Sequence, residues 1–167
     1  MSLLPAVEID AADLDFAPRL AIAISSFNQP VIELLEQGCM AALNEAGLAP
    51  EQVTLVRVPG AFELPLACQR LALSGQFDAL IALGAVIRGE TPHFDYVAEA
   101  VERGVLDIQL SFELPVVFGV LTTDTAEQAF ARARPEEGDK GGDAARAALE
   151  MISVLRQLDD LLPADTQ

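Results

Sequence analysis

Four short runs of apolar residues divide the chain, and each is followed by a longer stretch with the period of an amphipathic helix. Such runs are typical of strands buried on both faces, because apolar and polar residues do not alternate in them. They predict strands at residues 20–25, 53–58, 78–83 and 116–121. Since strands and helices alternate, the pattern predicts an α/β fold with about four parallel strands and helices on both faces of the sheet.

The stretches between these runs predict the covering helices, because their apolar residues recur at three- and four-residue spacing. Asn28 and Thr91 stand where N-cap residues are expected, and Pro30 and Pro92 fall in the first turns. The predicted helices span residues 31–47, 61–75, 91–112, 128–133 and 143–162.

The length of 167 residues suits one domain with a buried core, and no linker or repeat divides the chain. Residues 1–18 lack a clear period and carry Pro5 and Pro18, so we predict an N-terminal arm there. We predict a single α/β domain at residues 19–162 and a short tail at residues 163–167.

The net charge of −16 excludes nucleic acid as an expected partner, because a phosphate backbone needs a basic surface. No apolar run is long enough to predict a membrane span, and the first residues do not resemble a secretory signal. Cys39 and Cys68 lie within helical patterns, which is typical of buried free thiols in a reducing cytoplasm. A small anionic ligand remains open, since helix N-termini and a few arginines can bind one.

Three irregular stretches follow strand ends, at residues 25–28, 59–63 and 84–93. In parallel α/β sheets ligands bind outside the carboxyl ends of the strands, so these stretches predict one site. A helix that begins near Thr91 would direct free N–H groups there, which predicts a phosphate or carboxylate seat around Gly89–Thr91. The alternative is that Gly89 and Thr91 only shape and cap the turn.

His93 is the only histidine in the chain, and it follows this predicted seat. An imidazole at this edge of the sheet can accept and return a proton near neutral pH, although a lone histidine is more often structural. Phe27, Phe62 and Phe118 could stack on a planar ring, while the usual role of phenylalanine is core packing. Phe27 is the least expected in a core, because it lies in a polar turn.

Other candidate residues leave two interpretations open. Glu63 near a helix start either complements the helix dipole or binds a polyol, and Arg132 and Lys140 either hold an anion or are solvated. No cysteine pair or histidine cluster suggests a metal site, so no metal ligand is predicted. The glycine-rich signatures of dinucleotide and nucleoside triphosphate sites and the hydrolase elbow are also absent from the sequence.

Several motifs closely resemble the lumazine synthase family, from about Leu20 to Leu158 and in the same order. The motifs are "SSFN", "VPGAFELP", "ALGAVIRGETPHFDYV", "VVFGVLTTDTAEQAFARA" and "GDKGGDAARAALEM". The resemblance implies a three-layer flavodoxin-like fold and the penultimate step of riboflavin biosynthesis. In that step 5-amino-6-(D-ribitylamino)uracil and 3,4-dihydroxy-2-butanone 4-phosphate condense to 6,7-dimethyl-8-ribityllumazine, with loss of phosphate and water and without a cofactor.

The resemblance also implies roles for individual residues. His93 would be the proton donor and acceptor, and Glu90, Thr91 and Arg132 would bind the phosphate, with the Glu90 side chain turned away. Phe118 and Arg132 would reach the site from a neighbouring subunit, with Asn28 and Lys140 as accessory residues. The pyrimidine and ribityl group would contact Phe27, Ala61, Phe62, Glu63, Ala85, Val86, Ile87 and Phe118.

A shared site predicts a homo-oligomer, with a pentamer favoured over an icosahedral shell. The sequence "RPEEGDKGG" replaces the turn that shell-forming members tend to keep, and Ser26 replaces a common arginine. The net charge also opposes the approach of rings at low salt. The resemblance raises riboflavin synthase as a partner to test.

Three other functions remain open: a flavodoxin-like flavin carrier or phospho-receiver, an enzyme that uses Lys140 as a Schiff-base amine, and a cage protein without chemistry. The turn after the first strand lacks both the phosphate loop of a flavin carrier and the acidic cluster of a receiver.

Overall fold

The computed structural model describes residues 6–165, so residues 1–5 of the predicted arm and 166–167 of the predicted tail lie outside the described residues. Within this range the chain forms one parallel sheet of four strands in the order β2-β1-β3-β4. The strands are β1 (Leu20–Ser25), β2 (Val53–Val58), β3 (Ala79–Ile87) and β4 (Val116–Thr123). The prediction of four parallel strands is confirmed.

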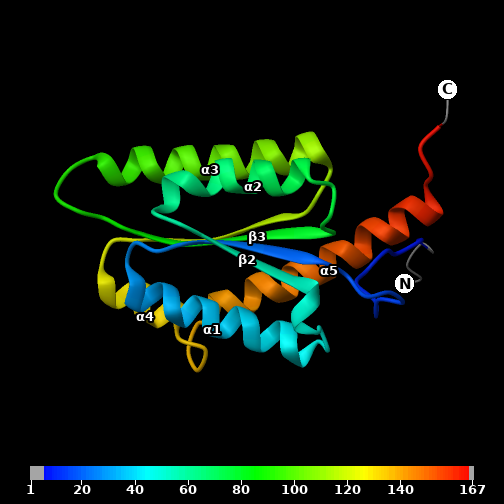
Figure 1. The fold of residues 1–167 in the computed structure, drawn as a ribbon, viewed down its shortest axis with the longest axis horizontal. Coiled ribbons are helices and arrows are strands. Elements are labelled where there is room, and N and C mark those ends of the chain that lie inside the picture. Colours follow the sequence, from blue (N-terminus) through cyan, green and yellow to red (C-terminus); the bar gives the residue numbers. More distant parts are fainter. Residues whose placement is uncertain (1–5, 166–167) are drawn as a thin grey trace, which may run out of the picture.

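Helices cover both faces of the sheet (Figure 1). On one face lie α2 (Leu64–Leu73) and α3 (His93–Phe112), and on the other lie α1 (Gln29–Glu45), α4 (Ala126–Ala133) and α5 (Lys140–Leu161). Short 3₁₀ turns at Pro50–Gln52 and Ala61–Glu63 precede β2 and α2. The predicted three-layer, flavodoxin-like arrangement is therefore confirmed.

Successive side chains of each strand point to opposite faces of the sheet, and each face has its own hydrophobic core. Ile22 and Ile24 of β1 pack with Leu35 of α1 on one face, while Ala23 packs with Leu64 of α2 on the other. All five are essentially inaccessible to solvent. Burial of each large side chain contributes roughly 1.5–3 kcal/mol, and the runs without polar alternation exist because both faces are covered.

The third strand is longer than the sequence predicts. Residues 84–87, expected as a turn, continue β3 and pair with β4 from Gly84↔Val120 to Ile87↔Thr123. A Cβ at Gly84 would lie 3.1 Å from Leu64 and 3.2 Å from Ser25, so glycine leaves room for close packing there. The glycine that suggested a turn therefore serves packing, and the strand carries Ala85, Val86 and Ile87.

Both predicted side-chain caps are wrong, although Asn28 does occupy the N-cap position of α1. Its backbone is left-handed, with φ 64°, and its side-chain Nδ2 donates to the Ala85 carbonyl at 3.0 Å instead of its own helix. Helix α3 begins at His93 with Pro92 as the N-cap residue, and no side chain caps it. The Thr91 hydroxyl is thus not used as a cap.

The start of α5 packs closely on α1 through glycine. A Cβ built on Gly141 would overlap the Leu35 carbonyl oxygen of α1. Asp139, with φ 45°, precedes the helix and accepts a hydrogen bond from the Gly142 N–H at 3.2 Å. The hydrogen bond caps the start of α5, and the glycine at position 141 allows α5 to approach α1 closely.

Gly141→Ala is therefore expected to lower the free energy of unfolding by about 1–3 kcal/mol, because the added methyl forces the two helices apart. Chemical denaturation measures the change. Gly89→Ala is the matched control, since a Cβ at Gly89 meets no atom within 4 Å. Equal stability of the two variants would contradict the close approach of α1 and α5.

Candidate active site

A cavity of about 610 Å³ lies at the carboxyl ends of β1, β2 and β3. The strand order reverses between β1 and β3, and in sheets of this kind ligands bind at that switch point. The three irregular stretches expected to form one site therefore meet there. Its lining comprises Phe27, Asn28, Gly60, Ala61, Phe62, Glu63, Ala85, Val86, Ile87, Gly89, Thr91, His93, Phe94, Tyr96 and Val97.

The lining is mainly apolar with a few polar groups, which is the usual composition of a small-molecule site. The Phe27 and Phe62 side chains are 71% and 62% exposed, so neither belongs to the core. The lining thus carries two exposed aromatic rings that can contact a planar ligand. Core packing, the alternative role weighed for these two residues, does not describe them.

The segment between β3 and α3 contributes Gly89, Thr91 and His93 to the lining (the green loop in Figure 1). Among the described residues, no acceptor pairs with the backbone N–H groups of Gly89, Glu90 or Thr91. Unpaired N–H groups just before a helix N-terminus favour an anion. Glu90 itself is exposed and does not line the cavity, so only its backbone can serve such a seat.

Glu63 lines the cavity and also forms a hydrogen bond within its own turn. Its Oε2 accepts a hydrogen bond from the Gly60 N–H at 3.1 Å, which closes the 3₁₀ turn before α2. The second carboxylate oxygen has no such bond and can accept one from a ligand hydroxyl. The structure thus gives Glu63 a turn-closing role that the sequence did not predict, and polyol binding stays a prediction.

The two cysteines take no part in this site. Cys39 and Cys68 are buried and free, and burial raises the pKa of each thiol to about 12. At neutral pH both remain protonated, and only the thiolate is a strong nucleophile.

Groups of three or more metal-ligating side chains are not found within residues 6–165. No helix of the described part is long and apolar enough to cross a membrane.

Besides Glu90, three predicted site residues lie outside the cavity of their own chain. Phe118 and Lys140 line a separate groove beside β4 and the start of α5, and Arg132 lies on α4. The Arg132 Nη1 donates to the Gln128 carbonyl at 3.2 Å, and Lys140 Nζ lies 3.2 Å from Asp143 Oδ2. Within one chain the structure does not bring these three residues to His93.

The amino-acid sequence also matches a known protein family. A sequence model of 6,7-dimethyl-8-ribityllumazine synthase matches residues 17–156, which is well over half of the chain. The chain belongs to the lumazine synthase family. Among solved structures it is similar to a de novo designed Rossmann fold protein, at 15% identity, 67% coverage of this chain, 90% of that chain and a TM-score of 0.39. That likeness is too low to bear on the site.

Membership in the lumazine synthase family confirms the resemblance seen in the motifs and indicates an enzyme of riboflavin biosynthesis. The matched segment contains every residue that lines the cavity. Family membership therefore argues against a flavin carrier and against a phospho-receiver.

The cavity of this lumazine synthase family member also includes residues that sequence reasoning missed. Tyr96, the only tyrosine, is 70% exposed and lines the cavity with Phe94 and Val97. Tyr96 lies three residues after His93, so helical spacing could have placed both side chains on one face of α3. We make no prediction for Tyr96 from the sequence.

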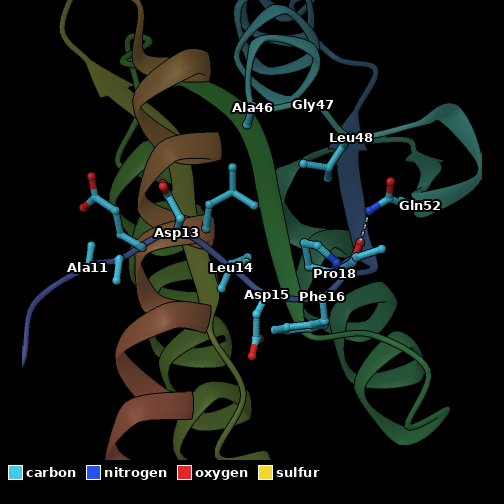
Figure 2. A pocket seen from close by; sticks show the side chains of 14 residues that line it. Ala11, Asp13, Leu14, Asp15, Phe16, Pro18, Ala46, Gly47, Leu48 and Gln52 are labelled. Carbon is cyan, nitrogen blue, oxygen red and sulfur yellow. Dashed lines mark hydrogen bonds between the residues drawn. The ribbon is translucent and has the colours of Figure 1, made fainter.

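A larger cavity of about 900 Å³ lies between residues 11–18, the end of α1 and α5 (Figure 2). Its ionisable side chains are all acidic: Asp13, Asp15 and Glu150. It borders Pro18, which precedes the amino end of β1, and Gln52 donates to the Pro18 carbonyl at 2.8 Å. Its described lining residues include no basic side chain, and the cavity lies near the amino end of β1, whereas ligands of parallel sheets bind at the carboxyl ends. The cavity is therefore poorly suited to an anionic substrate.

Proposed function

We propose that this chain condenses 5-amino-6-(D-ribitylamino)uracil with 3,4-dihydroxy-2-butanone 4-phosphate to form 6,7-dimethyl-8-ribityllumazine, and is thus a transferase. The observation that carries the proposal is that one cavity joins exposed aromatic rings, unpaired N–H groups and the only imidazole of the chain. These features suit a planar base, a phosphate and a proton transfer, respectively.

In the proposed reaction the pyrimidine stacks on Phe27 and its polyol chain reaches Glu63. The phosphate of the second substrate is bound by the N–H groups of Gly89–Thr91 and the free Thr91 hydroxyl. The primary amine then attacks the ketone, and loss of water gives an imine. Phosphate is eliminated, the product tautomerises to expose a carbonyl, and the ribitylamino nitrogen closes the ring on that carbonyl with loss of a second water. His93, at the first residue of α3, accepts and returns protons, while binding both substrates together supplies proximity.

The site is proposed to be completed by a second copy of the chain. Phe118, Arg132 and Lys140 lie outside the cavity that holds His93 in their own chain, which supports the proposal that they serve the site of a neighbouring copy. Exposed apolar side chains on α2 and α3 support contacts between copies, since isolated domains seldom carry so many: Leu66, Leu73, Tyr96, Leu106 and Leu110. A pentamer is favoured, and the buried free thiols fit a cytoplasmic location.

Arg132→Ala is expected to raise the KM for the phosphorylated four-carbon substrate by about tenfold or more, because a charge-assisted contact to phosphate is lost. The KM for the pyrimidine should change much less. Steady-state kinetics with each substrate varied in turn measures both values. Arg134→Ala, which removes the same charge nearby from an ion pair with Glu137, is the control. Equal shifts of both KM values would place Arg132 outside the phosphate site.

The proposed product distinguishes this function from flavin carriage. The purified chain is mixed with both substrates, and the absorption spectrum and mass of the product are recorded. A ribityllumazine that forms only when both substrates are present supports the proposal. A chain that releases bound flavin and forms no ribityllumazine would overturn it.

A further inference from the structure

Arg88 lies next to the predicted phosphate seat but contacts protein groups on several sides. Its Nε donates to Asp124 Oδ1 at 2.8 Å, and its Nη1 lies 3.4 Å from Asp95 Oδ1. The guanidinium carbon lies 4.4 Å from the centre of the Phe94 ring. The backbone N–H of Arg88 donates to the Thr123 carbonyl at 2.8 Å. One side chain therefore joins the ends of β3 and β4 to the first turn of α3.

The short segment between Arg88 and α3 has few other restraints. A Cβ on Gly89 would meet no atom within 4 Å, so packing does not define the backbone there. The described hydrogen bonds include none donated by the N–H groups of Gly89, Glu90 or Thr91. The geometry of this segment is consequently set by how its two ends are held.

We propose that Arg88 is a positioning residue that holds the Gly89–Thr91 segment in the shape that receives the substrate phosphate. The Arg88 clamp consists of Arg88 with Asp124, Asp95 and Phe94. This inference rests on the proposed function for the identity of the anion, and it assigns Arg88 no contact with substrate.

The planar shape of the guanidinium is what makes the clamp work. A guanidinium donates in fixed directions and stacks on an aromatic ring at the same time, whereas the ammonium of lysine is a point charge on a flexible stem. The hydrogen bond to Asp124 raises the pKa of Arg88, so the charge is present at all relevant pH values. Each exposed ion pair alone is weak, but here three contacts restrain one short segment.

Arg88→Ala is expected to raise the KM for the phosphorylated substrate by about tenfold, with the pyrimidine KM changed less than about twofold, because a loosened seat binds the phosphate poorly. Arg88→Lys keeps the charge and should restore little of this loss. Asp124→Asn should shift the same KM in the same direction. Arg103→Ala is the control, since Arg103 lies further along α3 in an exposed pair with Glu99.

Binding of inorganic phosphate gives a readout that does not depend on turnover. Calorimetric titration of the assembled protein should show weaker phosphate binding for Arg88→Ala than for the parent chain or Arg103→Ala, at unchanged thermal stability. If the parent chain binds phosphate in this way but forms no lumazine, the proposed function fails and the role of Arg88 stands.

Three results would overturn the role of Arg88. The first is an Arg88→Ala variant with parental phosphate binding and KM values, in a chain that still makes lumazine. The second is full rescue by lysine, which would mean that charge acts on the phosphate directly. The third is a parent chain that neither binds phosphate nor turns over.

Discussion

Replacing His93 with alanine is expected to lower kcat by about 10²–10⁴-fold and to leave measurable turnover. His93 lines the cavity at the first residue of α3 and is the only imidazole in the chain, so no second histidine can replace it. Some turnover should survive because the cavity still holds both substrates together. Single-turnover kinetics with saturating substrates measures the chemical step.

His93→Asn provides the matched variant, because an amide keeps hydrogen bonding but cannot transfer a proton at neutral pH. It should be nearly as slow as the alanine variant, with thermal stability and oligomeric state unchanged. Parental kcat in either variant, with an intact fold, would remove His93 from the proton transfers.

Mixing two impaired variants is expected to restore part of the activity if subunits share each site. His93→Ala supplies an intact Arg132, and Arg132→Ala supplies an intact His93, so a site built from two different copies can contain both residues. After dissociation and random reassembly at equal amounts, about one site in four should be fully formed, because each half is drawn independently in a head-to-tail ring. At substrate concentrations below KM, activity should reach about a quarter of the parental value, whereas Arg132→Ala alone keeps about a tenth or less and His93→Ala falls about 10²–10⁴-fold.

The control for this experiment is the double variant His93→Ala/Arg132→Ala mixed with the parent chain. Both substitutions then lie on one copy, and activity should follow the same shared-site statistics. Mixing that restores nothing, in assemblies shown to contain both chains, would contradict a site that takes His93 from one copy and Arg132 from another.

The fold was predictable because short apolar runs in the sequence identify its strands. The runs at residues 20–25 and 53–58 form β1 and β2 with the predicted bounds, since strands buried on both faces carry no competing pattern. A parallel sheet brings its strand ends together, so the sequence predicts that Phe27, Phe62 and His93 surround one site, and all three line the cavity. Sequence order alone was enough for that step.

The details that failed involve contacts between distant segments. Asn28 looked like a helix cap, but its amide reaches the Ala85 carbonyl on a different strand. Gly84 looked like a turn, but it lies in a strand where neighbouring side chains need its space. Local spacing cannot reveal such partners, and the Arg88 clamp was missed for the same reason, because Asp124 follows thirty-six positions later.

The residues expected from a neighbouring subunit could not be predicted from sequence spacing. Phe118, Arg132 and Lys140 were assigned through the family resemblance, and in one chain they lie away from His93. Their roles stay predictions, and the mixing experiment addresses them directly. Sequence spacing within one chain carries no signal for contacts between copies.

The proposed condensation is tested most directly by measuring phosphate and lumazine in the same progress curve with the purified chain. Both products should appear at equal rates and in equal amounts, and neither should form when one substrate is omitted. Phosphate release from the four-carbon substrate alone, or the absence of lumazine with both substrates present, would contradict the proposed function.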